Sequence, residues 1–315
     1  MQDKINQFNS LKSEWKLFQS KNKKIRIRDA ADQIGVSEAQ LLSTEIGGDT
    51  LYLSINDFSF FLKEVFSIDK LMLLIRSDIV VHEKTIKSRN IKFIKNQILD
   101  KNNDLILDFD QSLFKYVFFQ NKVHANRQLR SFQIFNFEGK AVLKIYLKGK
   151  ESSNFDRIAK KYTSDYNYQL QSPIKAVSPI GESQKIDAYF IGKNTEFRNS
   201  EISTKSLRII LTKASDMRLP IQIHGLGLGT VQYHRDKVRN IVDYGPWINV
   251  IDRNFNLHVL ESELYKSVLS VCDKGNQKYC IVNFFNKNNE HILGITSIKG
   301  LEDNFFSIID NIEEN

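Results

Sequence analysis

The chain has 315 residues, of which 41% are hydrophobic and 26% are charged, with a net charge of +8. This composition excludes an intrinsically disordered chain, and the length suits two domains of ordinary size. No stretch approaches the roughly 18 apolar residues of a membrane-spanning helix, and the residues from Met1 to Gln7 lack the apolar core of a signal peptide. We therefore expect no membrane span and a cytoplasmic location, which two cysteines without a disulfide framework also favour. The positive charge favours an anionic partner.

Residues 1–70 predict mostly helices. Leu11, Trp15 and Phe18 follow the spacing of one helix face. Another helix is expected over residues 56–64.

Between these helices, residues 28–42 predict a helix that ends at Gly35 and a second helix capped by Ser37. The pair has the outline of a helix-turn-helix. A helical hairpin that only packs against the rest of the domain is the more common structure for such a pattern.

From residue 71 onward, short apolar runs separated by turn residues predict strands. In the first half these strands are residues 71–75, 78–82, 105–107, 130–135 and 141–147. The last two form a hairpin around Glu138-Gly139. A helix over residues 152–162 closes this half, and the polar stretch over residues 163–185 is the expected linker. In the second half, strands are expected near residues 220–223, 279–285 and 291–297.

Parts of the chain repeat at a spacing of 150 residues. Arg89-Asn90-Ile91 returns as Arg239-Asn240-Ile241 (239 − 89 = 150), and Phe135-Asn136 returns as Phe285-Asn286 (285 − 135 = 150). This spacing exceeds the roughly 20–50 residues of a solenoid repeat, so it indicates two similar domains that arose by duplication.

The repeat determines the predicted fold class. We expect an α+β protein of two tandem pseudo-repeats, each a helical cap followed by a large antiparallel β-sheet. The first repeat is expected over residues 1–170 and the second over residues 171–315. The helical motif at residues 36–41 returns only at 202–207, a spacing of 166, so the second helical cap is shortened.

Several motifs resemble one bacterial family. These are Val81-His82-Glu83-Lys84, Val231-Gln232-Tyr233-His234, the block from Gly245 to Asp252, and Phe255-Asn256-Leu257-His258. Together with Arg28-Asp29-Ala30-Ala31, they are similar to the bacterial hemin-degrading factors, also called cytoplasmic heme-transport proteins (the HemS/ChuS group). The resemblance covers nearly the whole chain and identifies it as a divergent member.

The resemblance implies cytoplasmic heme binding and trafficking in iron acquisition, with heme b as ligand or substrate. It implies a heme-uptake transporter and a downstream heme acceptor or reductase as partners. Whether the protein is an enzyme that degrades heme to release iron stays open, since a carrier needs only to bind.

The family's usual axial histidine has no counterpart here. It lies in an Asp-Thr-His-aromatic stretch, which corresponds to Asn194-Thr195-Glu196-Phe197, and there is no histidine between His124 and His224. His224 is therefore the candidate ligand for the heme iron. The resemblance suggests His82 as a second possible heme contact.

Cations for the heme propionates are the other requirement of such a site. Arg239 occupies a basic position that faces a propionate in relatives, and Lys237 and Arg235 are nearby substitutes.

Each candidate has a structural alternative. His82 and His234 occupy similar strand positions in the two repeats, which favours strand histidines hydrogen-bonded to the backbone. Tyr233 is a candidate phenolate ligand or a core residue, and Arg239 faces a ligand or ends a solvated strand. The glycine run at residues 225–229 has the wrong spacing for a dinucleotide loop, and such a run in a strand more often permits close backbone approach or a bulge.

The alternative function is a non-catalytic binding module that has lost heme. Such a module would bind an anionic partner such as nucleic acid, in keeping with the charge and the helix-turn-helix outline.

Overall fold

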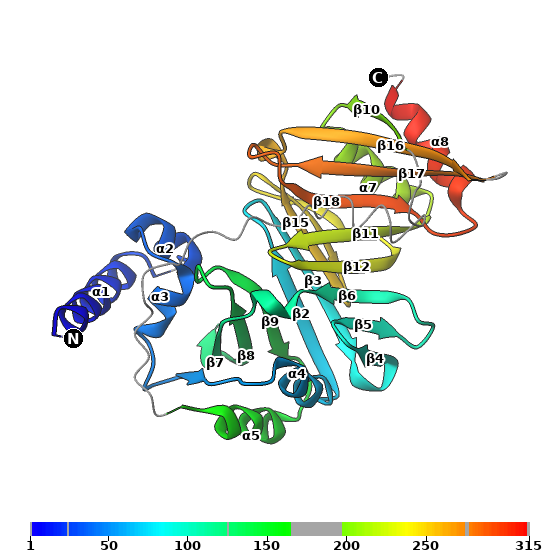
Figure 1. Cartoon of the computed structure of the whole chain (residues 1–315). Coiled ribbons are helices and arrows are strands. Elements are labelled where there is room, and N and C mark those ends of the chain that lie inside the picture. Colours follow the sequence, from blue (N-terminus) through cyan, green and yellow to red (C-terminus); the bar gives the residue numbers. More distant parts are fainter. Residues whose placement is uncertain (1, 24, 125, 165–196, 275–276, 314–315) are drawn as a thin grey trace. The chain divides into compact units, whose positions relative to one another are not determined.

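The computed structural model describes residues 2–23, 25–124, 126–164, 197–274 and 277–313 (Figure 1). The helices labelled there are α1 Gln2–Lys21, α2 Ile27–Ile34, α3 Glu38–Ser43, α4 Phe58–Phe66, α5 Ser152–Tyr162, α7 Ser206–Asp216 and α8 Glu302–Glu313. The strands of the first half are β1 Thr50–Leu53, β2 Lys70–Arg76, β3 Val80–Lys87, β4 Ile91–Ile94, β5 Gln97–Asp100, β6 Leu105–Phe109, β7 Tyr116–His124, β8 Arg127–Phe135 and β9 Ala141–Leu147. Those of the second half are β10 Arg198–Ile202, β11 Pro220–Gly227, β12 Thr230–Lys237, β13 Ile241–Tyr244, β14 Trp247–Asp252, β15 Phe255–Leu260, β16 Lys266–Lys274, β17 Gln277–Phe285 and β18 His291–Ser297.

The chain folds into two compact units that are interleaved along the sequence. The first unit comprises Met1–Leu73, Ile86–Asn96 and Asp110–Ser178, and the second comprises Leu74–Thr85, Gln97–Phe109 and Pro179–Asn315. Strands β3, β5 and β6 of the first half thus belong, wholly or mostly, to the second unit. The repeat boundary expected near residue 170 falls within residues 165–196, outside the described residues, and stays a prediction.

In the first unit, helices cover an antiparallel sheet in the strand order β1-β7-β8-β9-β2. Ala39 and Leu42 of α3 pack against Phe118 and Phe135 of the sheet. On the other side of α3, a small core centred on buried Trp15 includes Leu41. The predicted helix face of Leu11, Trp15 and Phe18 is confirmed, because all three belong to this core.

The predicted helical hairpin is confirmed in detail. Gly35 ends α2 in the left-handed conformation, with φ of +82°. The Ser37 hydroxyl accepts the Gln40 backbone N–H, and the Gln40 side chain accepts that of Ser37, which forms a capping box. Five of the six residues of α3 are buried, including Glu38. The hairpin therefore packs on its own unit and α3 offers no exposed face to read DNA.

A buried ion pair anchors α3 to the sheet. The Lys144 ammonium on β9 contacts the Glu38 carboxylate, and both side chains are nearly inaccessible to solvent. Removing one partner of such a pair would leave an uncompensated buried charge.

In the second unit, the apolar core lies between two antiparallel sheets. One has the order β10-β16-β17-β18-β11-β12-β6-β5, and the other has the order β3-β15-β14-β13. Helices α7 and α8 contribute their apolar faces to the same core. The α+β prediction with two large antiparallel sheets is confirmed.

Equivalent side chains make equivalent contacts in the two repeats. The Gln133 amide donates to Gln120 at 2.8 Å, and the Asn283 amide, 150 residues later, donates to Ser270 at 3.4 Å. Asn136 accepts two backbone N–H groups in its turn, and its counterpart Asn286 does the same. The spacing of 150 residues therefore reflects a repeated structure.

Two pairs of repeat equivalents also touch each other within the second unit. Gln232 contacts His82, and His234 contacts Lys84, each pair being 150 residues apart. Residues that meet their own equivalents lie beside a local two-fold axis. His82 and His234 occupy similar strand positions, but they are two residues out of register with the spacing of 150 residues. Positions two apart share a strand face, so the pattern of the strand did not reveal the shift.

The glycine run explains how His82 fits between the sheets. A Cβ atom on Gly225 would lie 2.9 Å from the Cβ atom of His82, closer than real contacts allow. Gly229 adopts φ of +64° in the turn between β11 and β12. The prediction that the run permits close backbone approach is confirmed.

We expect Gly225→Ala to lower the free energy of unfolding by about 1–3 kcal/mol, because the added methyl group overpacks a fixed interior. Urea unfolding measures this. Gly48→Ala is the matched control, since the nearest atom to a Cβ there is 4.0 Å away. Equal stability of the two variants would contradict the close packing.

Candidate functional site

Strands β11 and β12 separate two sets of candidate residues. Opposite residues in an antiparallel pair point to one face of the sheet, and neighbours along a strand alternate. The pairs Ile223↔His234 and Gly225↔Gln232 face the interior of the unit. The pairs His224↔Tyr233 and Gln222↔Arg235 point to the opposite face. We call this opposite face, which also carries Gly294 of β18, the His224 face.

On the interior face, two histidines enclose Phe255. The ring of His234 stacks on Phe255 with centroids 3.7 Å apart, and His82 contacts the same ring edge-on at 4.9 Å. Lys84 Nζ lies 3.4 Å from Nδ1 of His234. The Gln232 amide lies 2.7 Å from Nδ1 of His82 and also donates to the His82 carbonyl. These contacts support the structural interpretation of His82 and His234, with a side-chain amide rather than backbone as the partner of the His82 ring.

Burial keeps the two histidines of this interior cluster, His82 and His234, uncharged. It lowers the pKa of His82 to about 3, with the nearby Lys84 ammonium as the second cause. The pKa of His234 is lowered well below its usual value for the same two reasons. Burial also lowers the pKa of Lys84, to about 8.

His224 is the buried histidine of the opposite face. Its Nε2 atom lies 1.8 Å from where a Cβ atom on Gly294 would be, so only glycine leaves room for the ring. The His224 ring centroid is 6.1 Å from Tyr233 and 6.2 Å from His291. Burial, followed by repulsion from His291 and His82, lowers the pKa of His224 well below its usual value. The imidazole is therefore neutral near pH 7, the form that binds a metal.

Polar groups surround His224 on this face. Arg235 donates to the Gln222 carbonyl oxygen through Nε at 2.8 Å and pairs with the Asp104 carboxylate. Two side-chain atoms, Nε2 of Gln222 and Oδ1 of Asn283, are buried with no hydrogen-bond partner among the described residues. Unsatisfied buried polar atoms are costly, so a ligand that bonded to them would stabilise the face.

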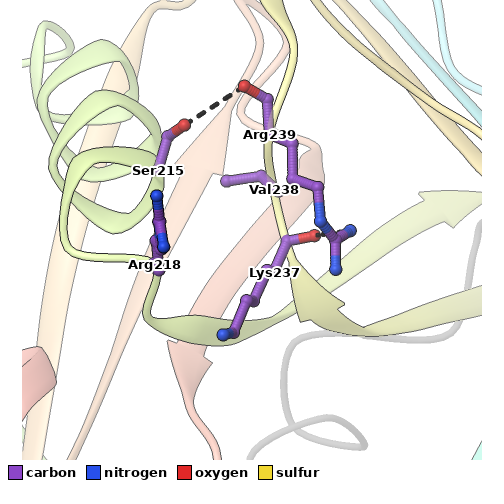
Figure 2. A pocket seen from close by; sticks show the side chains of 5 residues that line it. All are labelled: Ser215, Arg218, Lys237, Val238 and Arg239. Atoms are coloured by element: carbon purple, nitrogen blue, oxygen red, sulfur yellow. Dashed lines mark hydrogen bonds between the residues drawn. The ribbon is translucent and has the colours of Figure 1, made fainter.

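Arg239 and Lys237 lie elsewhere, in a basic hollow of about 440 Å³ (Figure 2). We define the basic hollow by its lining residues Ser215, Arg218, Lys237, Val238 and Arg239. The Ser215 hydroxyl donates to the Arg239 carbonyl at 3.2 Å. Arg239 also donates to the Lys237 carbonyl at 3.2 Å.

The register of β12 separates the hollow from His224. Tyr233 pairs with His224, Arg235 follows two residues later on the same face, and Lys237 ends the strand four residues later. At about 3.3 Å per residue, four residues span roughly 13 Å. The structure thus brings His224, Tyr233 and Arg235 together, while Arg239 and Lys237 gather at the end of α7.

Some site residues were not found from the sequence. Gly294 and His291 border His224 only through the pairing of β11, β17 and β18. Arg218 and Ser215 join the hollow through the packing of α7. The stretch at residues 194–196, expected to replace the axial histidine, lies outside the described residues.

Among the residues that the structure describes, no group of three or more histidine, cysteine or acidic side chains is placed to hold a metal ion. Within the same residues no helix is long and apolar enough to cross a membrane.

A family model agrees with the resemblance noted from the sequence. Residues 35–162 match the haemin-degrading HemS.ChuX domain. This match agrees, over residues 35–162, with the family resemblance predicted from the sequence.

Individual relatives extend the similarity to most of the chain. The hemin transport protein HmuS of Yersinia pestis is 24% identical over 277 residues, which cover 76% of this chain and 78% of that protein. The heme-degrading enzyme ChuS of Escherichia coli O157:H7 has a TM-score of 0.83 at 18% identity and covers 96% of this chain and 98% of its own. The heme-binding protein PhuS of Pseudomonas aeruginosa, in its holo form, has a TM-score of 0.81 at 18% identity, covering 97% and 99% of the two chains. These structures share the fold of this protein.

We expect stability to fall as the pH drops below about 6.5, where histidines of an unfolded chain gain protons. Folded His82 and His291 remain neutral down to about pH 3 and about pH 4 respectively, so the unfolded state binds more protons in this range. Each such histidine then costs up to about 1.4 kcal/mol per pH unit.

Urea unfolding of the wild type and of His82→Gln between about pH 6.5 and pH 5 tests this linkage. The variant carries the residue of the equivalent position, Gln232, and is expected to show the shallower pH dependence. Identical slopes would mean that His82 is not kept neutral by its burial.

Proposed function

We propose that the protein binds heme in the cytoplasm and either passes it on or degrades it to release iron. The bound molecule is heme b, supplied through a heme-uptake transporter and delivered to a downstream heme acceptor or reductase. The HemS.ChuX domain and the fold shared with ChuS and PhuS support this function.

The observation that carries the proposal is the neutral, buried His224 on a polar sheet face. A heme site requires an axial ligand, and a neutral imidazole is a common one. Since His224 is fully buried, heme has to displace the groups that cover the ring. We therefore expect binding to be preceded by a local opening, and its rate to be limited by that opening.

The other residues of the face have roles that follow from their chemistry. Arg235 is our candidate for a propionate contact, because it lies two residues from Tyr233 on the same face. Tyr233 packs beside the His224 ring and is the nearest alternative ligand. His82 and His234 would act indirectly, by fixing β12 from its interior side. Degradation needs one iron face left open to an oxygen species, so a single axial ligand suits it.

Heme titration of the purified protein, followed in the Soret region, tests the ligand. We expect a saturable one-to-one shift that His224→Ala abolishes, since the variant removes the coordinating nitrogen. His258→Ala is the control, because His258 and its hydrogen-bond partner Asn249 both lie on the sheet that does not contain His224. A shift that persists in His224→Ala would remove His224 as the ligand, and loss of the shift in Tyr233→Phe would then identify the phenolate. The absence of any saturable shift would contradict heme binding itself.

The same titration distinguishes the two arginines. We expect Arg235→Ala to weaken heme binding by roughly 1.5–3 kcal/mol, the contribution of one charge-assisted hydrogen bond. The propionate role expected for Arg239 makes the same prediction for Arg239→Ala. Loss of affinity in Arg239→Ala alone would place the propionates in the basic hollow and remove Arg235 from the site.

A further inference from the structure

We propose that the basic hollow is a second ligand site, which binds the phosphate group of a small molecule independently of heme. This goes beyond the proposed function, because it adds a site for a ligand of another chemical class. Its residues are those drawn in Figure 2.

The hollow gathers positive charge that the described residues neutralise only in part. Arg218, Lys237 and Arg239 line it together. The nearest ion pair joins Arg239 to Asp236 at 3.5 Å, with both side chains about half exposed. No ion pair of Arg218 or Lys237 with a carboxylate occurs among the residues that the structure describes. Three cations around one concave surface raise the local concentration of anions.

The backbone of Arg218 is a second and independent observation. The Arg218 N–H bonds to the Ser215 carbonyl and the Leu219 N–H bonds to the Ala214 carbonyl, the pattern of a Schellman motif at the end of α7. The residue after the helix in this motif is usually glycine, because its φ is positive. Here Arg218 adopts φ of +51°. The motif fixes the backbone of Arg218 at the end of α7, where its side chain lines the hollow with Lys237 and Arg239.

The donor set matches a phosphate group in particular. Two guanidinium forks and one ammonium supply charge-assisted hydrogen bonds to tetrahedral oxygens. A volume of about 440 Å³ falls within the range of small-molecule sites, so it accommodates a phosphate with an organic substituent.

The site is separate from the one proposed for heme. Lys237 ends β12 four residues beyond Tyr233, the partner of His224, which is roughly 13 Å along the strand. The other residues of the hollow come from the end of α7 and from the segment that follows β12. A ligand in the hollow touches residues at the end of β12 and none of those around His224.

Calorimetric titration of the heme-free full-length chain with inorganic phosphate at low ionic strength tests the proposal. Sodium chloride at matched ionic strength measures the nonspecific contribution. We expect saturable phosphate binding that Arg218→Gly weakens by about tenfold or more, as loss of one charge-assisted contact predicts. This variant also places glycine where the backbone favours it, so it is expected to fold at least as well as the wild type.

Lys95→Gly is the matched control, because Lys95 is an exposed cation that also adopts a positive φ, of 52°. Phosphate affinity is expected to be unchanged in this variant. Equal weakening by both substitutions, or no saturable phosphate binding to the wild type, would overturn the site.

A heme titration in saturating phosphate completes the test. Unchanged heme affinity is expected, and competition between the two would overturn the independence of the hollow. Because the phosphate titration contains no heme, failure of the proposed heme function would leave its outcome untouched.

Discussion

The arrangement of the second unit depends on the contact between β3 and β12 around Phe255. Each of these strands contributes a pair of polar side chains that meet their own repeat equivalents, His82 with Gln232 and Lys84 with His234. The contact is buried, so its hydrogen bonds cannot be exchanged for bonds to water without loss of stability. It fixes which side chains of β12 face inward, and with them the direction of every other residue on that strand.

The side chains of strand β12 therefore lie in three different environments. The inward residues of β12 hold the two sheets together, while Tyr233 and Arg235 point to the face that carries His224. At and beyond the last pair of the strand, Lys237 and Arg239 line the hollow at the end of α7. A substitution in the interior would shift both ligand-binding candidates at once, whereas substitutions on either surface should act separately.

Local sequence signals predicted much of the fold. Gly35 and Ser37 marked the helix boundaries because their side chains, or the lack of one, act within a few residues. The hairpins and α5 followed from short periodic patterns in the same way. The candidate site was harder to predict from the sequence, because Gly294 and His291 approach His224 only through strand pairing. Arg239 and His224 were expected in one site, since the sequence shows their proximity but not the length of strand β12 that separates them.

The room that Gly294 leaves for His224 has a consequence for how the two repeats diverged. The positions 150 residues earlier hold Leu74 and Lys144. In the first repeat the Lys144 side chain binds Glu38 of α3 and attaches the helical cap to the sheet. The space above this position of the sheet is therefore filled by the lysine side chain. In the second repeat a histidine side chain occupies it, and any residue larger than glycine at 294 excludes that ring. A histidine at 224 and a lysine at 294 are thus mutually exclusive, so the second repeat cannot hold both the histidine and the lysine that fastens the cap in the first.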